Sequence, residues 1–253
     1  MRHSPPVANV HLGIRELYPT LVESAVPLLR AEMEQHASVH ISNQDFKRDV
    51  RITIQDLALR KNPDMPYAHY SHLPYVPEAT SKVSLSYHGS LEGPNRREAV
   101  PGDYTKEFSP VLAGLSEFFE DAILQLHLVV TCQHDYSPIV DRDDRTSAIV
   151  SWADVAARML ETAPAATLTV WALEDPLEHC IPFILAVLGM RDLTLPDATR
   201  NRLVDLARRQ RFARPKMPLD QIDTKLSVYL DELYEKDLSR LQRMEQVTVI
   251  GAR

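Results

Sequence analysis

Short apolar segments of strand length alternate with longer segments of helical periodicity along most of this chain. The strand-like segments are residues 7–12, which a tight turn at Gly13 is expected to follow, 39–42, 83–87, 126–130, 168–171 and 247–250. A helix that connects two consecutive strands usually places them parallel in one sheet. We therefore expect an α/β fold with a mostly parallel central sheet that is covered by helices on both faces. Residues 126–130 and 168–171 have the apolar content of strands in the buried middle of such a sheet.

Amphipathic periodicity marks the helices between these strands. The helical segments are residues 20–36, about 43–59, 110–120, 151–162, 176–188, the segment from 197 onward, and 219–241. Pro27 should bend or split the first of them, because proline has no N–H to donate within a helix. The expected caps are Asn43 or Asp45, Ser151 and Asp197 at N-termini, and Gly189 at a C-terminus. In residues 50–54 an alternating strand pattern competes with the helix, and both interpretations stay open.

Two proline- and glycine-rich stretches interrupt this order, at residues 62–81 and 89–104. We expect both to be irregular loops. The segment 83–87 between them has the pattern of a sheet strand, so the loops do not mark a domain boundary. Residues 1–253 are therefore expected to form a single α/β domain.

Composition excludes several classes of partner. The formal net charge is −7, which disfavours a general nucleic-acid binder because phosphates require a basic face. No window of 18 consecutive apolar residues occurs, so we expect no membrane span. Met1 to Asn9 is polar and lacks the apolar core of a signal peptide, which favours a cytoplasmic location. Cys132 and Cys180 fit no metal or redox spacing and are expected to be reduced and buried.

Two segments of the second half carry a resemblance to a known family. The first segment combines Trp152 with the run Ala166-Thr-Leu-Thr-Val-Trp-Ala-Leu-Glu174-Asp175, which leads into a helix that ends Ala186-Val-Leu-Gly189. The tail reads Leu233-Tyr-Glu-Lys-Asp-Leu-Ser-Arg-Leu241, followed by Val247-Thr-Val-Ile250. These segments resemble the motifs "W…VW.YED" and "Y..D…I…V.F" of bacterial sulfotransferase-like proteins in the P-loop superfamily. The resemblance covers most of the chain loosely, and it implies a sulfotransferase-like three-layer sandwich.

Members of that family bind 3′-phosphoadenosine-5′-phosphosulfate through a loop that reads "HIGxHKTGTT". Here the corresponding stretch is His11-Leu-Gly-Ile-Arg-Glu-Leu-Tyr-Pro-Thr20. His11, Gly13 and Thr20 match, and the resemblance makes them candidate cofactor-binding residues. Glu16 stands in place of the lysine, and a carboxylate beside a phosphosulfate repels it. Arg15 could supply a cation one position earlier and completes the candidate set.

The remaining family positions also depart from the pattern. The family places an arginine just after the central strand and a serine about eight residues later. This chain has Thr131 and Cys132 after that strand, and Ile139 at the serine position. Leu85-Ser-Tyr-His-Gly-Ser-Leu-Glu-Gly93 resembles the family's "LSSE" or "LSYE" segment, with His88 in place of the glutamate. An imidazole can accept a proton from an acceptor hydroxyl, so His88 is the candidate catalytic residue.

These departures favour a sulfotransferase-like protein with a degenerate donor site. We expect a non-catalytic binding or regulatory role that needs no cofactor and involves an unknown protein or small-molecule ligand. The alternative hypothesis is an active sulfotransferase that moves a sulfuryl group to a hydroxyl or amine. That enzyme would bind 3′-phosphoadenosine-5′-phosphosulfate through a rebuilt site with Arg15 and His88.

Other polar residues allow a functional and a structural interpretation. His69 and His72 could bind a metal with His88 and Asp135, but their proline-rich loop does not constrain the spacing, so no metal site is predicted. His11 could orient a ligand at the carboxyl edge of the sheet, or it could be a half-buried strand histidine bonded to the backbone.

The arginines around residues 208–211 could meet a phosphate or an acidic partner, but a solvated helix end is the plainer explanation. Trp152 and Trp171 are expected in the core.

Overall fold

A computed structural model gives the fold, and it describes residues 5–13, 21–49, 70–73, 76–88, 104–130, 151–172, 176–212 and 224–251. Arg15, Thr20 and the ambiguous segment 50–54 lie outside these ranges. Most of the two expected loops also lies outside them, although a short 3-10 helix, η2 (Tyr70–His72), is present in the first. No helix in the described ranges is both long enough and apolar enough to cross a membrane.

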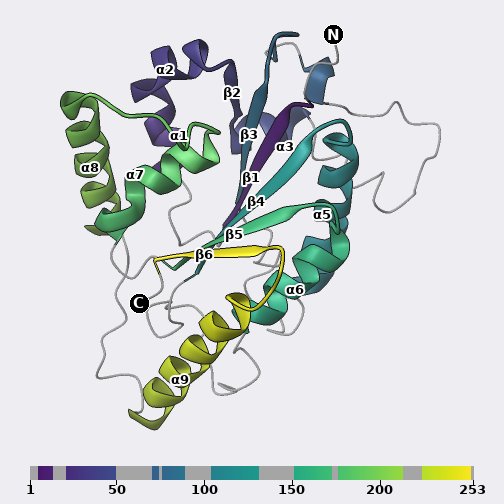
Figure 1. Cartoon of the computed structure of the whole chain (residues 1–253), viewed down its shortest axis with the longest axis vertical. Coiled ribbons are helices and arrows are strands. Elements are labelled where there is room, and N and C mark those ends of the chain that lie inside the picture. The colour runs from purple at the N-terminus through teal and green to yellow at the C-terminus, as the bar shows by residue number, and fades with distance from the viewer. Residues whose placement is uncertain are drawn as a thin grey trace.

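Within the described ranges, six strands form one sheet in which every neighbouring pair is parallel (Figure 1). The strand order is β2-β3-β1-β4-β5-β6, so the first strand lies in the middle. The strands are β1 (Val7–Gly13), β2 (Ser38–Ile41), β3 (Lys82–His88), β4 (Ile123–Val130), β5 (Thr167–Ala172) and β6 (Val247–Ile250). The expectation of a parallel α/β sheet is confirmed, and each strand includes most of the segment that the sequence predicts.

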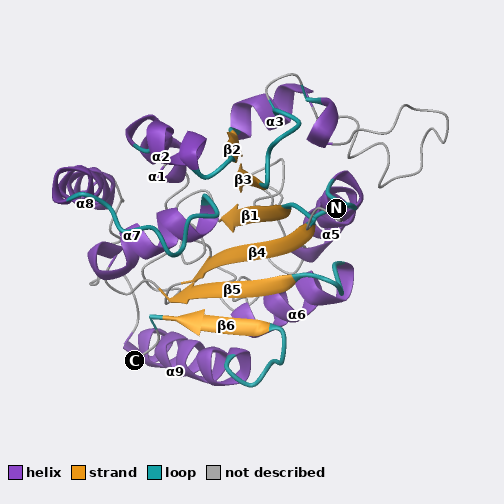
Figure 2. Ribbon diagram, turned by 45° about the horizontal axis from the view of Figure 1, so that its top comes forward, coloured by secondary structure: helices purple, strands orange, loops and turns teal. Residues whose placement is uncertain are grey.

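Helices cover both faces of this sheet and complete three layers (Figure 2). α1, α7 and α8 lie on one side, whereas α5 and α6 lie on the other, and α9 lies beside β6. The helices are α1 (Leu21–Ala25), η1 (Val26–Leu28), α2 (Arg30–Gln35), α3 (Asn43–Asp49), α5 (Tyr104–Phe118), α6 (Trp152–Thr162), α7 (Pro176–Val187), α8 (Asp197–Phe212) and α9 (Thr224–Leu241).

Local chemistry explains where several helices begin and end. Pro27 lies in the 3-10 turn η1 between α1 and α2, so the predicted split is confirmed. Ser151 caps α6 by accepting a hydrogen bond from the backbone N of Asp154, also as predicted. Gly189 has φ 72° and follows α7, as its predicted role at the C-terminus requires. There Met190 N donates to Leu185 O while Gly189 N donates to Ala186 O, which is a Schellman motif.

Three predicted helix starts are wrong in detail. α3 is capped by Ser42, whose hydroxyl donates to Asp45 Oδ2 and accepts from Asp45 N, so neither Asn43 nor Asp45 is the cap. α5 begins at Tyr104, so Pro110 lies inside the helix and does not start it. Asp197 is the first residue of α8 and not its cap, because Arg200 N donates to Pro196 O. The expected cap lies one or three residues after the observed cap in α3 and one residue after it in α8. The expected start of α5 lies six residues after the observed start.

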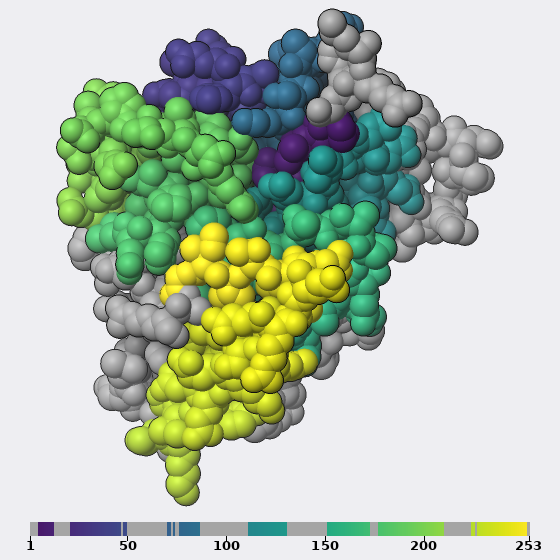
Figure 3. Space-filling model, in the orientation of Figure 1, coloured from purple at the N-terminus to yellow at the C-terminus, as the bar shows by residue number. Residues whose placement is uncertain are grey.

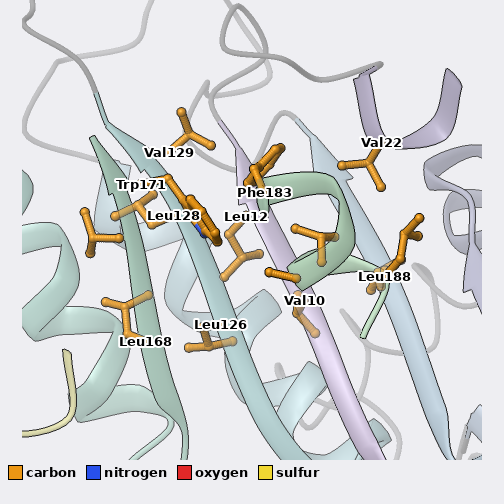
Figure 4. Close-up of a cluster of buried hydrophobic side chains, with 14 of the residues drawn as sticks. Val10, Leu12, Val22, Leu126, Leu128, Val129, Leu168, Trp171, Phe183 and Leu188 are labelled. Atoms are coloured by element: carbon orange, nitrogen blue, oxygen red, sulfur yellow. The ribbon is translucent and has the colours of Figure 1, made fainter. Parts of the chain in front are cut away.

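The core is continuous across the sheet, and Figure 4 shows part of it. Val10, Leu12 and Leu126 lie along neighbouring strands and are fully buried. Trp152 and Trp171 are 4% and 1% exposed, as expected of core residues, and Cys180 is a buried thiol that donates to Leu177 O. Cys132 lies outside the described ranges.

A buried carboxylate joins α9 to α6. Asp237 on α9 is 1% exposed and accepts hydrogen bonds from Ser151 Oγ (2.7 Å) and from the backbone N of Trp152 (2.6 Å). Arg240, one turn further on, donates to Asp154 Oδ1 at 2.6 Å. Figure 3 shows α9 and β6 in yellow at the surface, so this connection holds a peripheral helix to the body of the molecule.

Candidate functional site

The strand order creates a switch point between β1 and β4. From β1 the chain continues to β2 on one side, whereas from β4 it continues to β5 on the other. The two adjacent strands therefore send their connections in opposite directions from their carboxyl ends. In open α/β sheets, ligands bind in the crevice that such a divergence leaves. The carboxyl edge at β1 is consequently the place where a site is expected.

The fold brings two of the predicted site residues together at this edge. Gly13 ends β1 and is the register partner of His88, which ends β3. The two residues are 75 positions apart in sequence, so the sheet alone creates this pairing. The side chain of His88 is not described, and Arg15 and Thr20 lie outside the described ranges. The structure thus places Gly13 and the backbone of His88 but does not describe Arg15 or Thr20.

His11 lies in the interior and not at the surface of the edge. Its side chain is fully buried, and its ring packs edge-on against Phe183 of α7 with the centroids 5.0 Å apart. Figure 4 shows Phe183 on α7 close to β1. His11 lies in a strand as the structural interpretation expects, but its burial is complete and not partial. Its position two residues before Gly13 places it directly beneath the edge.

A row of buried polar side chains lies on the sheet face that α7 covers. Its members are at most 6% exposed, and they are Asn9, His11, Ser38, Ser84, Ser86, His127 and Thr169. Alternate residues of a strand share one face, and register pairs the row across β2, β3, β1, β4 and β5. Sequence reasoning missed six of the seven. The period-two recurrence of polar residues, such as Ser84 and Ser86, was the signal that could have found them.

Three of these strands are joined by a chain of hydrogen bonds. Trp171 Nε1–H donates to His127 Nδ1 at 3.3 Å, so Nδ1 is an acceptor and carries no proton. The proton of neutral His127 therefore lies on Nε2, which donates to Asn9 Oδ1 at 3.3 Å. Burial, with a smaller contribution from the charge of Arg191, lowers the pKa of His127 to about 3. His127 is therefore uncharged in the folded protein at neutral pH.

Two further members of the row have their own partners. Ser84 Oγ donates to Val39 O at 3.2 Å and lies 3.0 Å from His40 Nδ1. Thr169 Oγ1 accepts a hydrogen bond from Arg191 Nη2 at 2.8 Å. These bonds compensate the desolvation of both hydroxyls.

At the carboxyl edge near β1, the described strand ends carry no positive charge, although Lys106 lies in the first turn of α5, which follows β3 in the chain. The last three residues of each of the six strands contain no Lys or Arg. The first turns of α1 and α7 contain none either, and each carries a carboxylate, Glu23 and Glu178. Helix N-termini favour anions, and an acidic side chain in the first turn opposes a second negative charge there.

The metal interpretation of the loop histidines gains no support. His69 and Asp135 lie outside the described ranges, and the side chains of His72 and His88 are not described. In the remainder of the chain that the structure describes, no three His, Cys, Asp or Glu residues are grouped as metal ligands would be.

Comparisons with known proteins give no match: no protein-family model, no curated protein and no solved structure is similar to this chain. The likeness to sulfotransferases therefore rests on the sequence motifs.

Proposed function

We propose that this chain is a non-catalytic binding protein of sulfotransferase-like architecture. Its ligand site is the carboxyl edge at β1, and the site no longer holds 3′-phosphoadenosine-5′-phosphosulfate. The parallel sheet with its switch point at β1 and β4 supports the location of the site. The cytoplasmic location expected from the sequence remains a prediction.

One observation carries the loss of the donor: the last three residues of each described strand contain no Lys or Arg, and the first turns of α1 and α7 each contain a carboxylate and no cation. Phosphosulfate recognition depends on cations and on N–H groups that face the ligand. Glu16, at the family's lysine position, adds a further negative charge in the sequence. A multiply charged nucleotide would be repelled and not held by such a set of groups.

Calorimetric titration with 3′-phosphoadenosine-5′-phosphate tests this proposal. We expect no saturable binding by the unmodified chain below about 1 mM, which corresponds to about −4 kcal/mol. Glu16→Lys should bind at least about tenfold more tightly than the unmodified chain, because it restores the missing cation. Glu16→Gln is the matched control: it removes the acid without adding a cation and should give a smaller gain. Micromolar binding by the unmodified chain would refute the proposal.

The alternative, an active sulfotransferase, is favoured by one specific observation. Gly13 of the candidate donor loop and His88, the candidate base, are register partners at the edge. If this alternative holds, the chain binds the nucleotide, and His88→Ala abolishes sulfuryl transfer to a hydroxyl or amine acceptor while nucleotide affinity is retained.

A further inference from the structure

Ser86 differs from the other hydroxyl-bearing members of the buried polar row, since Ser38, Ser84 and Thr169 each have a hydrogen-bond partner. Its side chain is fully buried, yet its hydroxyl oxygen has no hydrogen-bond partner among the residues that the structure describes. Ser84, two residues earlier on the same face of the same strand, bonds to Val39 and His40. A buried hydroxyl without a partner destabilises a folded protein, so its presence requires an explanation.

The position of Ser86 in the sheet explains why a buried hydroxyl is present there. Ser86 is the register partner of His11, and the next pair toward the edge that shares their alternation is Gly13 and His88. The hydroxyl therefore lies directly below the carboxyl edge where the sheet's ligand crevice is expected. Residues in binding sites commonly lower stability in the free protein because their partner is the ligand.

Toward the carboxyl edge, the strands beside Ser86 offer no charged partner. On its face, β1 places His11 opposite Ser86 and Asn9 opposite Ser84, and Asn9 is bonded to neutral His127 of β4. Arg191, a cation at this face, is bonded to Thr169 of β5. The last three residues of β1 and β3 contain no Lys, Arg, Asp or Glu. A phosphate or sulfate group would find no countercharge from these strands, whereas a hydroxyl, carbonyl or amide could exchange a hydrogen bond with Ser86.

We propose that the Ser86 hydroxyl is a ligand-recognition group that binds an uncharged hydrogen-bonding group of the ligand. The proposal rests on the proposed binding function and specifies the chemical class of the ligand. It also requires that a small uncharged molecule can reach Ser86 from the carboxyl edge.

Cysteine labelling tests this access and the charge preference together. Ser86→Cys and its control Ser84→Cys are treated with iodoacetamide, which is uncharged, and with iodoacetate, which is an anion of similar size. Unmodified protein reports the background from Cys132 and Cys180. We expect iodoacetamide to alkylate Ser86→Cys about tenfold faster than Ser84→Cys, because only the former lies below the crevice. For Ser86→Cys, the ratio of the alkylation rate by iodoacetamide to that by iodoacetate should be larger in the folded protein than in the unfolded protein.

Stability provides a second readout. Ser86→Ala should leave the melting temperature of the free protein unchanged or raise it, whereas Ser84→Ala should lower it by about 2–4 °C. Equal, slow labelling of both cysteines, or a loss of stability in Ser86→Ala as large as in Ser84→Ala, would overturn the proposal. A preference of Ser86→Cys for iodoacetate would overturn the uncharged ligand class. None of these measurements uses the nucleotide, so they fail or succeed independently of the titration that tests the proposed function.

Discussion

At the scale of single residues, the buried histidine in β4 shows how the sheet handles a polar side chain. His127 has both ring nitrogens engaged, one as acceptor from Trp171 and one as donor to Asn9. This arrangement requires the neutral ring, because a protonated Nδ1 would face the indole N–H. Burial opposes protonation in the same direction.

A pH dependence of stability follows from His127. The folded-state pKa of about 3 lies below the value of 6.5 for an exposed histidine, so the unfolded chain binds this proton first. The contribution of His127 to the free energy of unfolding is therefore fully present above pH 6.5 and is lost as the pH falls toward 3. The loss at the acid end is about 5 kcal/mol. Denaturant unfolding at a series of pH values measures it.

His127→Gln is the matched control, because glutamine keeps a neutral donor and acceptor but does not titrate. Its free energy of unfolding should decline less between pH 6.5 and 3 than that of the unmodified chain. Parallel declines in the two proteins would show that His127 does not cause the dependence.

At the scale of elements, the carboxylate of Asp237 connects α9 to the N-terminus of α6. The N-terminus of α6 presents backbone N–H groups that lack partners within the helix. Asp237 accepts from one of them, at Trp152, and from the capping Ser151. A single side chain thus satisfies the start of one helix and attaches another helix to it.

Removing this carboxylate should weaken the contact between α6 and α9. We expect Asp237→Ala to lower the free energy of unfolding by about 3 kcal/mol, because two hydrogen bonds to a charged group are lost at a buried position. Glu232→Ala on the exposed side of α9 should stay within about 0.5 kcal/mol of the unmodified chain. Chemical denaturation of the three proteins checks this difference, and equal stabilities would contradict it.

At the scale of the whole molecule, the strand order places the first strand at the centre. β1 pairs with β3 on one side and with β4 on the other, whereas β2 and β6 are edge strands. Opening β1 disrupts two ladders and the core on both faces, but opening β6 disrupts one ladder with β5.

Amide hydrogen exchange should therefore be slower in β1 than in β6. We expect the amides of Val10 and Leu12 to exchange at the rate of global unfolding, and those of β6 to exchange faster through local opening. Native-state exchange followed by mass spectrometry or NMR measures both. Equal protection in β1 and β6 would show that the sheet opens only as one unit.

The helices and strands could be predicted from the sequence, because the residues that start, end and pattern them are close together in the chain. Alternating apolar residues, Pro27, Ser151 and Gly189 act within a few positions of themselves, and each has its predicted effect. Glu16 at the family's lysine position is likewise a fact of sequence, and it is the origin of the proposed loss of the donor.

The tertiary structure decided what no local signal contains. The pairing of Gly13 with His88 and of Ser86 with His11 depends on β3 lying next to β1, and that order is set by packing between distant segments. The burial of His11 and His127 likewise follows from α7 covering one face of the sheet. The sequence determines which residues form strands, because the spacing of apolar residues and the Gly and Pro residues between segments are local signals. Which polar groups become buried neighbours is a property of the assembled sheet, because it depends on contacts far apart in the chain.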